Sequence, residues 1–119
     1  MITIDASDAS RLAKEMAAHT KRLGALVQGV MRAQGPIIAS EVQALAPVTN
    51  KVPGYSNTIR SRVTPVAAGA TITVESSSPF GYILEFGAGR SGPHPHFEPV
   101  RDPAAARLEQ LLSALADTI

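Results

Sequence analysis

The spacing of apolar positions changes along the chain, and each change marks a predicted element. Ile2 and Ile4 alternate with polar neighbours, which predicts a short strand. Beyond Asp8, the expected N-cap, apolar residues recur mostly every three or four positions, with Arg and Lys on the other face. This pattern predicts a long N-terminal amphipathic helix. Its apolar stripe consists of Leu12, Met16, Leu23, Leu26, Val27, Val30 and Met31.

The Gly-Pro step at 35–36 interrupts this helix, because proline lacks the amide hydrogen of the helical ladder and crowds the preceding turn. Proline also suits the first position of a helix, so the step predicts a kink or break and then a short second helix to about Ala46. Residues 47–57 contain Pro, Gly, Thr, Asn and Ser, and predict an exposed loop. The β-branched residues at 59–66 and the alternation at 71–74 predict a β-hairpin.

The last third of the chain predicts one short element and a final helix. Residues 80–86 form an apolar stretch that suits a helix or a strand equally. A Gly-rich loop follows, Phe97 begins a short extended piece, and Asp102 with Pro103 predicts the N-cap and first turn of the C-terminal helix. The buried stripe of that helix is predicted at Leu108, Leu111, Leu112 and Leu115. A long N-terminal helix and a C-terminal helix packed on a small antiparallel sheet, an α+β fold in one domain, bury these faces.

Composition narrows the classes of function. The 119 residues suffice for one domain, and the 45% hydrophobic content supports a core. Aromatic residues make up only 4%, so alanine supplies much of that content and self-association is expected, because each Ala removes little surface from water. The net charge of +1 argues against tight general DNA binding. The absence of cysteine excludes disulfides, thiolate zinc sites and Cys nucleophiles, and no signal peptide or membrane span is expected.

Two patterns near the Gly-rich loop carry candidate chemistry. A Gly-x-Gly-x-x-Gly pattern occurs at 87–92, but Pro-His-Pro follows it where a nucleotide site needs a helix, so we expect loop turns. His94 and His96 stand on alternate residues, with Glu85 and Glu98 as further ligands, which suits a metal ion. The prolines beside His94 equally explain a stiff loop. The sequence favours packing and hydrogen bonding at an interface, and no cofactor is expected.

Neither a nucleophile elbow nor a placed His-Asp pair indicates an enzyme. Lys51, Arg60 and Arg62 form a small basic stretch near Tyr55. We expect these arginines, which share one strand face, to be solvated or to pair with a neighbouring subunit. Contact with nucleic acid is an alternative that the residue types leave open. Four aromatic residues surround the Gly-rich loop and predict a core that anchors its ends: Phe80, Tyr82, Phe86 and Phe97.

Two short motifs stand on either side of this loop. The run FGYILEFG at 80–87 contains an aromatic residue, two apolar residues, Glu, Phe and Gly, and PHPHFEP at 93–99 precedes the last helix. Together with the long helix, the Ala-Pro step at 46–47 and the strand start at 59–60, they resemble the tail-completion, or head-tail joining, proteins of long-tailed bacteriophages. The resemblance covers most of the chain from about Leu12.

The chain departs from the family pattern at two places, and both concern loop geometry. The family has Thr-Gly directly before the strand, where this chain has a longer segment at 50–57. The family also has a single Pro-Phe step, whereas His96 separates Pro95 from Phe97 here.

The resemblance implies a structural virion protein rather than an enzyme, without catalytic, metal or cofactor-binding residues. It implies a homo-oligomer, commonly a hexameric ring, that joins the DNA-filled head to the tail. The implied partners are a head-completion protein and a tail terminator or tail tube protein, with DNA only passing through the lumen and no membrane. The implied place is the virion neck, after assembly in the host cytoplasm. A tail terminator capping the tail tube is the alternative that the sequence does not separate.

We expect the loops 47–58 and 87–96 to make subunit or ring-to-ring contacts, because Gly- and Pro-rich loops are natural docking surfaces. The candidate interface residues lie in and beside them: Lys51, Tyr55, Arg60, Arg62, Glu85, Phe86, Arg90, His94, His96 and Phe97.

Overall fold

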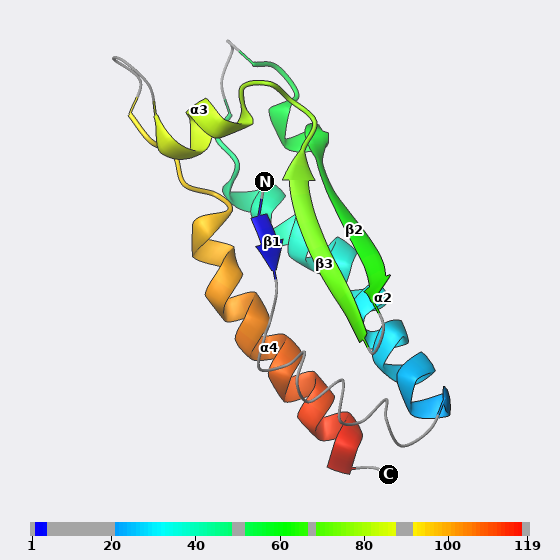
Figure 1. Cartoon of the computed structure of the whole chain (residues 1–119). Helices are drawn as coiled ribbons and strands as arrows, with labels where there is room; N and C mark the ends of the chain where they lie inside the picture. Colours follow the sequence, from blue (N-terminus) through cyan, green and yellow to red (C-terminus); the bar gives the residue numbers. More distant parts are fainter. Residues whose placement is uncertain (1, 5–20, 49–51, 67–68, 88–91, 118–119) are drawn as a thin grey trace.

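A computed structural model describes residues 2–4, 21–48, 52–66, 69–87 and 92–117. In chain order its elements are β1 (Ile2–Ile4), α2 (Lys21–Leu45), the 3-10 helix η1 (Tyr55–Thr58), β2 (Ile59–Val66), β3 (Gly69–Ser76), α3 (Gly81–Phe86) and α4 (Glu98–Asp117). Two long helices and a small antiparallel sheet make this an α+β fold, as predicted (Figure 1). The expected N-cap Asp8 and the helix predicted before residue 21 lie outside the described residues.

The sheet has three strands in the order β1-β3-β2. The predicted hairpin is confirmed: β2 and β3 pair antiparallel with Ile59 opposite Ser76. The predicted N-terminal strand is also confirmed, since β1 pairs antiparallel with the other side of β3 and sets Ile2 opposite Val74. β2 is therefore an edge strand, which is the position in a sheet that tolerates a proline such as Pro65.

One face of the sheet is apolar and the other is polar. α2 lies across β2 and β3, and α4 lies beside α2 and β1, so both helices cover the apolar face (Figure 1). Arg60, Arg62 and Thr64 are exposed on the opposite face, in line with the alternation of side chains along a strand. The core between the layers consists of Val27, Met31, Ile38, Ala39, Val42, Tyr55, Ile59, Ala70, Ile72, Val74, Phe97, Val100, Ala104, Leu108 and Leu112.

Of the kink or break predicted at the Gly-Pro step, the break with a separate second helix is wrong, because α2 is a single helix with Pro36 inside it. Gly35 is buried against β2, where a Cβ would lie 3.1 Å from Val63 Cγ2 and 3.3 Å from Ser61 Oγ. This glycine therefore lets the helix approach the sheet closely. Buried apolar side chains on both sides of the step hold the helix together against the cost of the proline, about 3 kcal/mol: Val27, Met31, Ile38 and Val42.

The final helix begins earlier than predicted. The sequence predicts an extended piece from Phe97 and an N-cap at Asp102, but α4 begins at Glu98 and contains Pro103. A carboxylate from α3 replaces the expected local cap, as described below. In the predicted stripe Leu108 and Leu112 are fully buried, Leu115 is half-buried and Leu111 is exposed.

Part of the predicted exposed loop 47–57 is helical and buried. Gly54 adopts a φ of 71°, in the left-handed region that favours glycine, and turns the chain into η1. η1 places Tyr55 in the core, where only 2% of the residue is exposed. The loop therefore contributes to the fold as well as to the surface. Residues 49–51 lie outside the described part of the chain.

Candidate functional site

Three polar residues from distant parts of the chain meet in a buried cluster at one end of the molecule. Tyr55 comes from η1, Glu85 from α3 and His96 from the segment that leads into α4. Their exposed fractions are 2%, 6% and 0%. We call these three residues the polar cluster. All three are among the interface candidates from the sequence, and the fold brings them together as an internal joint.

Glu85 caps the start of α4. Its Oε1 accepts hydrogen bonds from the backbone N–H groups of His96 and Phe97, both at 2.9 Å, and its Oε2 accepts one from Glu98 at 3.3 Å. N–H groups at the start of a helix have no partner within the helix, and the helix dipole favours a negative charge there. The carboxylate therefore satisfies donors that would otherwise be buried and unpaired, and sets the start of α4 four residues before Asp102.

His96 uses both of its ring nitrogens. Nδ1 lies 2.8 Å from the carbonyl oxygen of His94 and 3.1 Å from Glu85 Oε1. Both neighbours are acceptors, so Nδ1 carries the proton. Nε2 lies 2.6 Å from the hydroxyl oxygen of Tyr55 and accepts the hydrogen bond that this hydroxyl donates. The imidazole is therefore fully satisfied inside the fold.

Tyr55 is held as a neutral donor. Burial raises the pKa of its hydroxyl above the usual 10.0, a hydrogen bond with Ser76 partly opposes the rise, and the charge of Glu85 adds to it. The ring meets His96 edge-on, with centroids 5.3 Å apart and planes at 81°. Within the described residues every buried side-chain nitrogen and oxygen has a hydrogen-bond partner. The polar cluster is thus a satisfied structural network.

The short helix α3 buries its polar face and exposes apolar side chains. Its two buried residues are Gly81 and Glu85, four positions apart and hence on one face. A Cβ on Gly81 would lie 3.3 Å from the Tyr55 hydroxyl and 3.3 Å from Ser76 Cβ, so glycine permits this close approach. With Gly81 and Glu85 buried, Tyr82, Ile83 and Phe86 of the same helix face outward, while Leu84 packs against the core.

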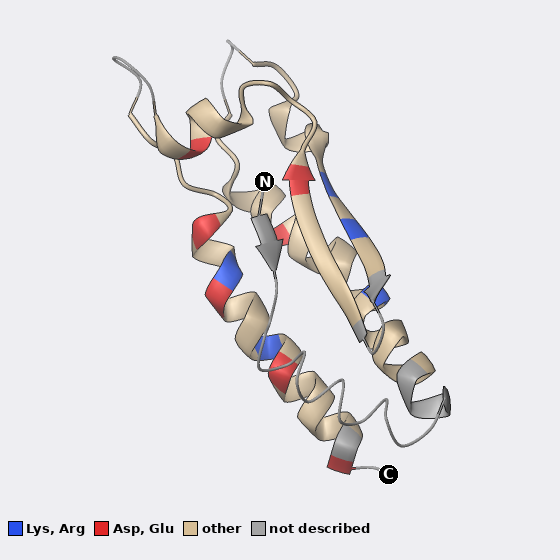
Figure 2. Cartoon of the chain, in the orientation of Figure 1, with Lys and Arg blue, Asp and Glu red and all other residues tan. Residues whose placement is uncertain are grey.

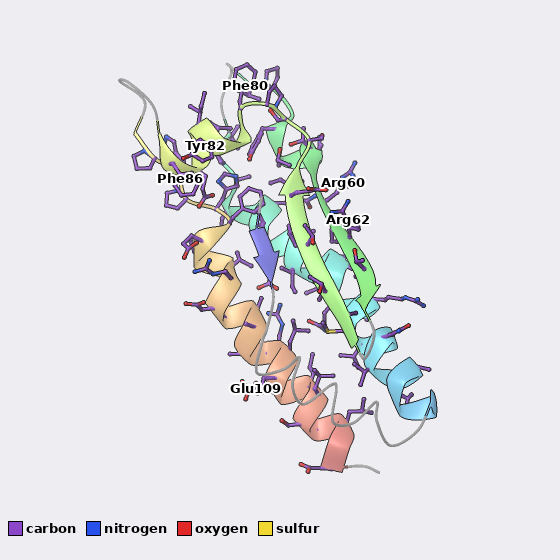
Figure 3. All side chains as sticks on the ribbon, viewed as in Figure 1. Arg60, Arg62, Phe80, Tyr82, Phe86 and Glu109 are labelled. Carbon is purple, nitrogen blue, oxygen red and sulfur yellow. The ribbon has the colours of Figure 1, made fainter. Side chains whose placement is uncertain are left out.

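The exposed apolar side chains of this region form a surface that we call the aromatic patch: Phe80, Tyr82, Ile83 and Phe86. Their exposed fractions are 49%, 72%, 39% and 61% respectively. The rings of Tyr82 and Phe86 contact each other, with centroids 4.8 Å apart (Figure 3). The expectation that Phe80, Tyr82 and Phe86 belong to the core is therefore wrong. It holds for Phe97, which is 3% exposed.

The remaining interface candidates do not join the polar cluster. Arg60 and Arg62 are exposed on the outer face of the sheet, and Arg62 lies 4.0 Å from Glu75 of β3 (Figure 2). The side chain of His94 is exposed. Its backbone N–H donates to the backbone carbonyl oxygen of Leu84 at 2.8 Å and so connects this loop to α3. Lys51 and Arg90 lie outside the described residues.

The described part of the chain also bears on the metal site considered from the sequence and on the expected lack of a membrane span. There, no three His, Asp or Glu side chains are grouped so that they could hold a metal ion. His96 in particular has no nitrogen left for one, since both serve the polar cluster. The described helices also lack the combination of length and apolar content that crossing a bilayer requires.

Comparisons of the chain with protein-family models, with curated proteins and with solved structures find no match.

Sequence reasoning identified Glu85 and His96 as candidates but missed how they are used. A lone Glu inside the apolar run 80–86 was the available signal, because a carboxylate in such a run is either at the surface or tightly bonded. Phe80, Tyr82 and Ile83 were missed as surface residues. Their exposure follows from the burial of Glu85, which the periodicity of a six-residue helix does not reveal.

Proposed function

We propose that this chain is a structural protein of the bacteriophage neck, which forms a ring that joins the DNA-filled head to the tail. The proposal starts from the motifs at 80–87 and 93–99, which resemble those of tail-completion proteins. The observation that carries it is the aromatic patch, because one of these motifs supplies every residue of an apolar surface that the isolated chain leaves in water.

The two motifs act as one unit in the fold, which supports reading them together. Glu85 of the first motif binds the backbone of His96, Phe97 and Glu98 in the second. His96, the residue that departs from the family pattern, is accommodated by Tyr55. The extra His96 is therefore compatible with the hydrogen bonds between Glu85 and the start of α4. The exposed side chains at this end of the molecule remain available for docking.

The size of the aromatic patch favours a protein contact. A whole aromatic residue buries about 200 Å², so the exposed fractions of Phe80, Tyr82 and Phe86 leave roughly 350 Å² of apolar surface in water. A patch of several hundred Å² on a monomer commonly marks an interaction site. The net charge of +1 suits a ring that lets DNA pass without holding it.

The proposed contact loops need one refinement. The loop 47–58 contains Tyr55, which is buried and bonded to His96. Removing the whole loop would thus damage the fold as well as any contact. Contacts within it are better assigned to exposed residues such as Val48 and Pro53.

A stop codon in the gene for this chain, placed in the phage genome that carries it, tests the proposal. Loss of a neck protein leaves DNA-filled heads and finished tails of normal length that do not join, as seen by negative-stain electron microscopy. Loss of a tail terminator, the alternative function, instead leaves tails of irregular length. Intact, infectious particles without the chain would overturn both functions. A plasmid copy of the wild-type gene should restore joined particles and serves as the control.

A further inference from the structure

The outer face of α2 is a second apolar surface on the described part of the molecule. Between residues 25 and 45 this helix has ten exposed residues, of which only Arg32 is charged. They include three large apolar side chains, Leu26, Ile37 and Leu45, with exposed fractions of 41%, 45% and 51%. We call these ten exposed residues the α2 outer face. An ordinary surface helix carries charged residues there.

The outer face of the sheet and the exposed side of α4 carry more charged residues. The outer face of the sheet carries Arg60 and Arg62, and the exposed side of α4 carries Glu98, Arg101 and Glu109 (Figures 2 and 3). Burying the carboxylates of α4 against aromatic rings would leave negative charges without water or a partner, which is costly. With one charged residue among ten, the α2 outer face is the least charged of these described surfaces, and we match it to the aromatic patch.

The two surfaces do not cover each other within one chain, because the residues of both are exposed. The molecule is elongated, 53 × 20 × 19 Å, and α3 lies at one end of it (Figure 1). α2 turns its inner side to β2 and β3; it begins at the opposite end and runs towards the end where α3 lies (Figure 1). Contact between the aromatic patch and the α2 outer face therefore requires two copies of the chain.

We infer that the aromatic patch of one copy packs on the α2 outer face of the next copy, and that this is the contact which closes the ring. The inference rests on the ring of the proposed function and names its subunit interface. The contact is heterologous, because different surfaces of the two copies meet, and such contacts form rings when the rotation closes.

Coverage of both apolar surfaces favours this contact over a symmetric one. A symmetric pairing of two aromatic patches would bury roughly 700 Å² in total, below the 1,200 Å² or so of a stable interface, and would leave the α2 outer face in water. The heterologous contact covers both surfaces, and each subunit of a ring makes it twice. A single contact remains small, so we expect assembly to depend on protein concentration.

Thiol cross-linking tests the contact, since the chain has no cysteine of its own. Ile83→Cys lies in the aromatic patch and Ala33→Cys on the α2 outer face, and both positions are exposed. With a short bismaleimide, the double variant should give a ladder of covalent oligomers that ends at the ring size. Each single variant should remain monomeric on a denaturing gel. An Ile83→Cys, Ala106→Cys variant, with the second cysteine on the exposed side of α4, is the matched control and should give no ladder.

Three results would overturn the inference: no ladder from the double variant, dimers from Ile83→Cys alone, or an equal ladder from the control. The second would show patch-to-patch pairing. A ladder from a chain whose loss does not affect head-tail joining would keep the contact and remove the neck function. Unjoined heads and tails together with no ladder would keep the neck function and remove the contact.

Charge substitutions give an independent readout. Phe86→Glu and Ile37→Glu should each raise the concentration needed for assembly at least tenfold, measured by light scattering coupled to size-exclusion chromatography. Leu111→Glu, at an exposed apolar position on α4, should leave assembly unchanged. All three sites are exposed, so circular dichroism should show an unchanged fold. Unchanged assembly in Phe86→Glu or Ile37→Glu would contradict the contact.

Discussion

Glu85 of α3 accepts a hydrogen bond from the backbone N–H of His96, eleven positions further along the chain and just before α4, at 2.9 Å. The same carboxylate also binds the N–H groups of Phe97 and Glu98. A helix of six residues thereby decides where a helix of 20 residues begins. By fixing Glu85 on the buried face of α3, these hydrogen bonds also determine which side chains α3 exposes to solvent, and hence the aromatic patch.

Removing the carboxylate should destabilise the fold strongly. We expect Glu85→Ala to lower the free energy of unfolding by about 2–3 kcal/mol, because three backbone donors lose a charged acceptor. Glu85→Gln keeps an acceptor oxygen without the charge and should cost about 1 kcal/mol. Urea denaturation followed by circular dichroism measures both. Glu98→Ala, at an exposed residue of the same joint, is the control, and an equal loss there would contradict the cap.

Tyr55→Phe should change how stability depends on alkaline pH. Because the pKa of Tyr55 is raised above 10.0 in the folded chain, its contribution is complete below about pH 10 and is lost as the pH rises through the folded-state pKa. At neutral pH the variant should lose about 1–3 kcal/mol, since His96 Nε2 loses its donor. The gap between wild type and variant should stay constant up to about pH 9 and narrow as the pH rises above about 10. A gap that remains unchanged in urea denaturation across this alkaline range would refute the raised pKa.

Two glycines in α2 should respond oppositely to alanine. A Cβ on Gly29 would meet nothing within 4 Å beyond its chain neighbours and the backbone of its own helix, so Gly29→Ala should stabilise the protein by about 0.5–1 kcal/mol through helix propensity. Gly35→Ala would place its Cβ 3.1 Å from Val63 Cγ2, and this crowding should cancel that gain. Thermal unfolding of both variants measures the difference. Equal stabilisation by both would show that β2 yields freely to the added methyl group.

The link between α2 and α4 depends on the planar guanidinium of Arg107. This group donates to Gln34 Oε1 at 3.2 Å and to both carboxylate oxygens of Glu41. Arg107→Lys keeps the charge but loses the forked geometry, and should cost about 0.5–1 kcal/mol, since both side chains are about one-third exposed. Arg101→Lys, whose partners lie on its own helix, is the control and should change unfolding by less than about 0.3 kcal/mol. Equal effects in urea denaturation would contradict a specific link between the helices.

Local pattern predicted the elements whose surroundings agree with their periodicity. The hairpin of β2 and β3, the strand β1 and the buried residues Leu108 and Leu112 follow directly from alternating or helical spacing. The predictions failed where a distant part of the chain changes the local outcome. Pro36 lies within α2 because the sheet holds both halves of the helix, and Asp102 does not begin α4 because Glu85 caps it earlier.

By itself, the sequence determined an α+β fold with two long helices on a small antiparallel sheet, because hydrophobic periodicity reports which face of each element is buried. It also placed Glu85, His96 and the surrounding aromatic residues near one another along the chain. Only the tertiary structure decided which of them are inside. Contacts with three backbone N–H groups and one imidazole stabilise the Glu85 carboxylate in the interior. Because a short helix at the surface cannot bury both of its faces, the opposite face of α3 is exposed. The rings of Tyr82 and Phe86 therefore face the solvent.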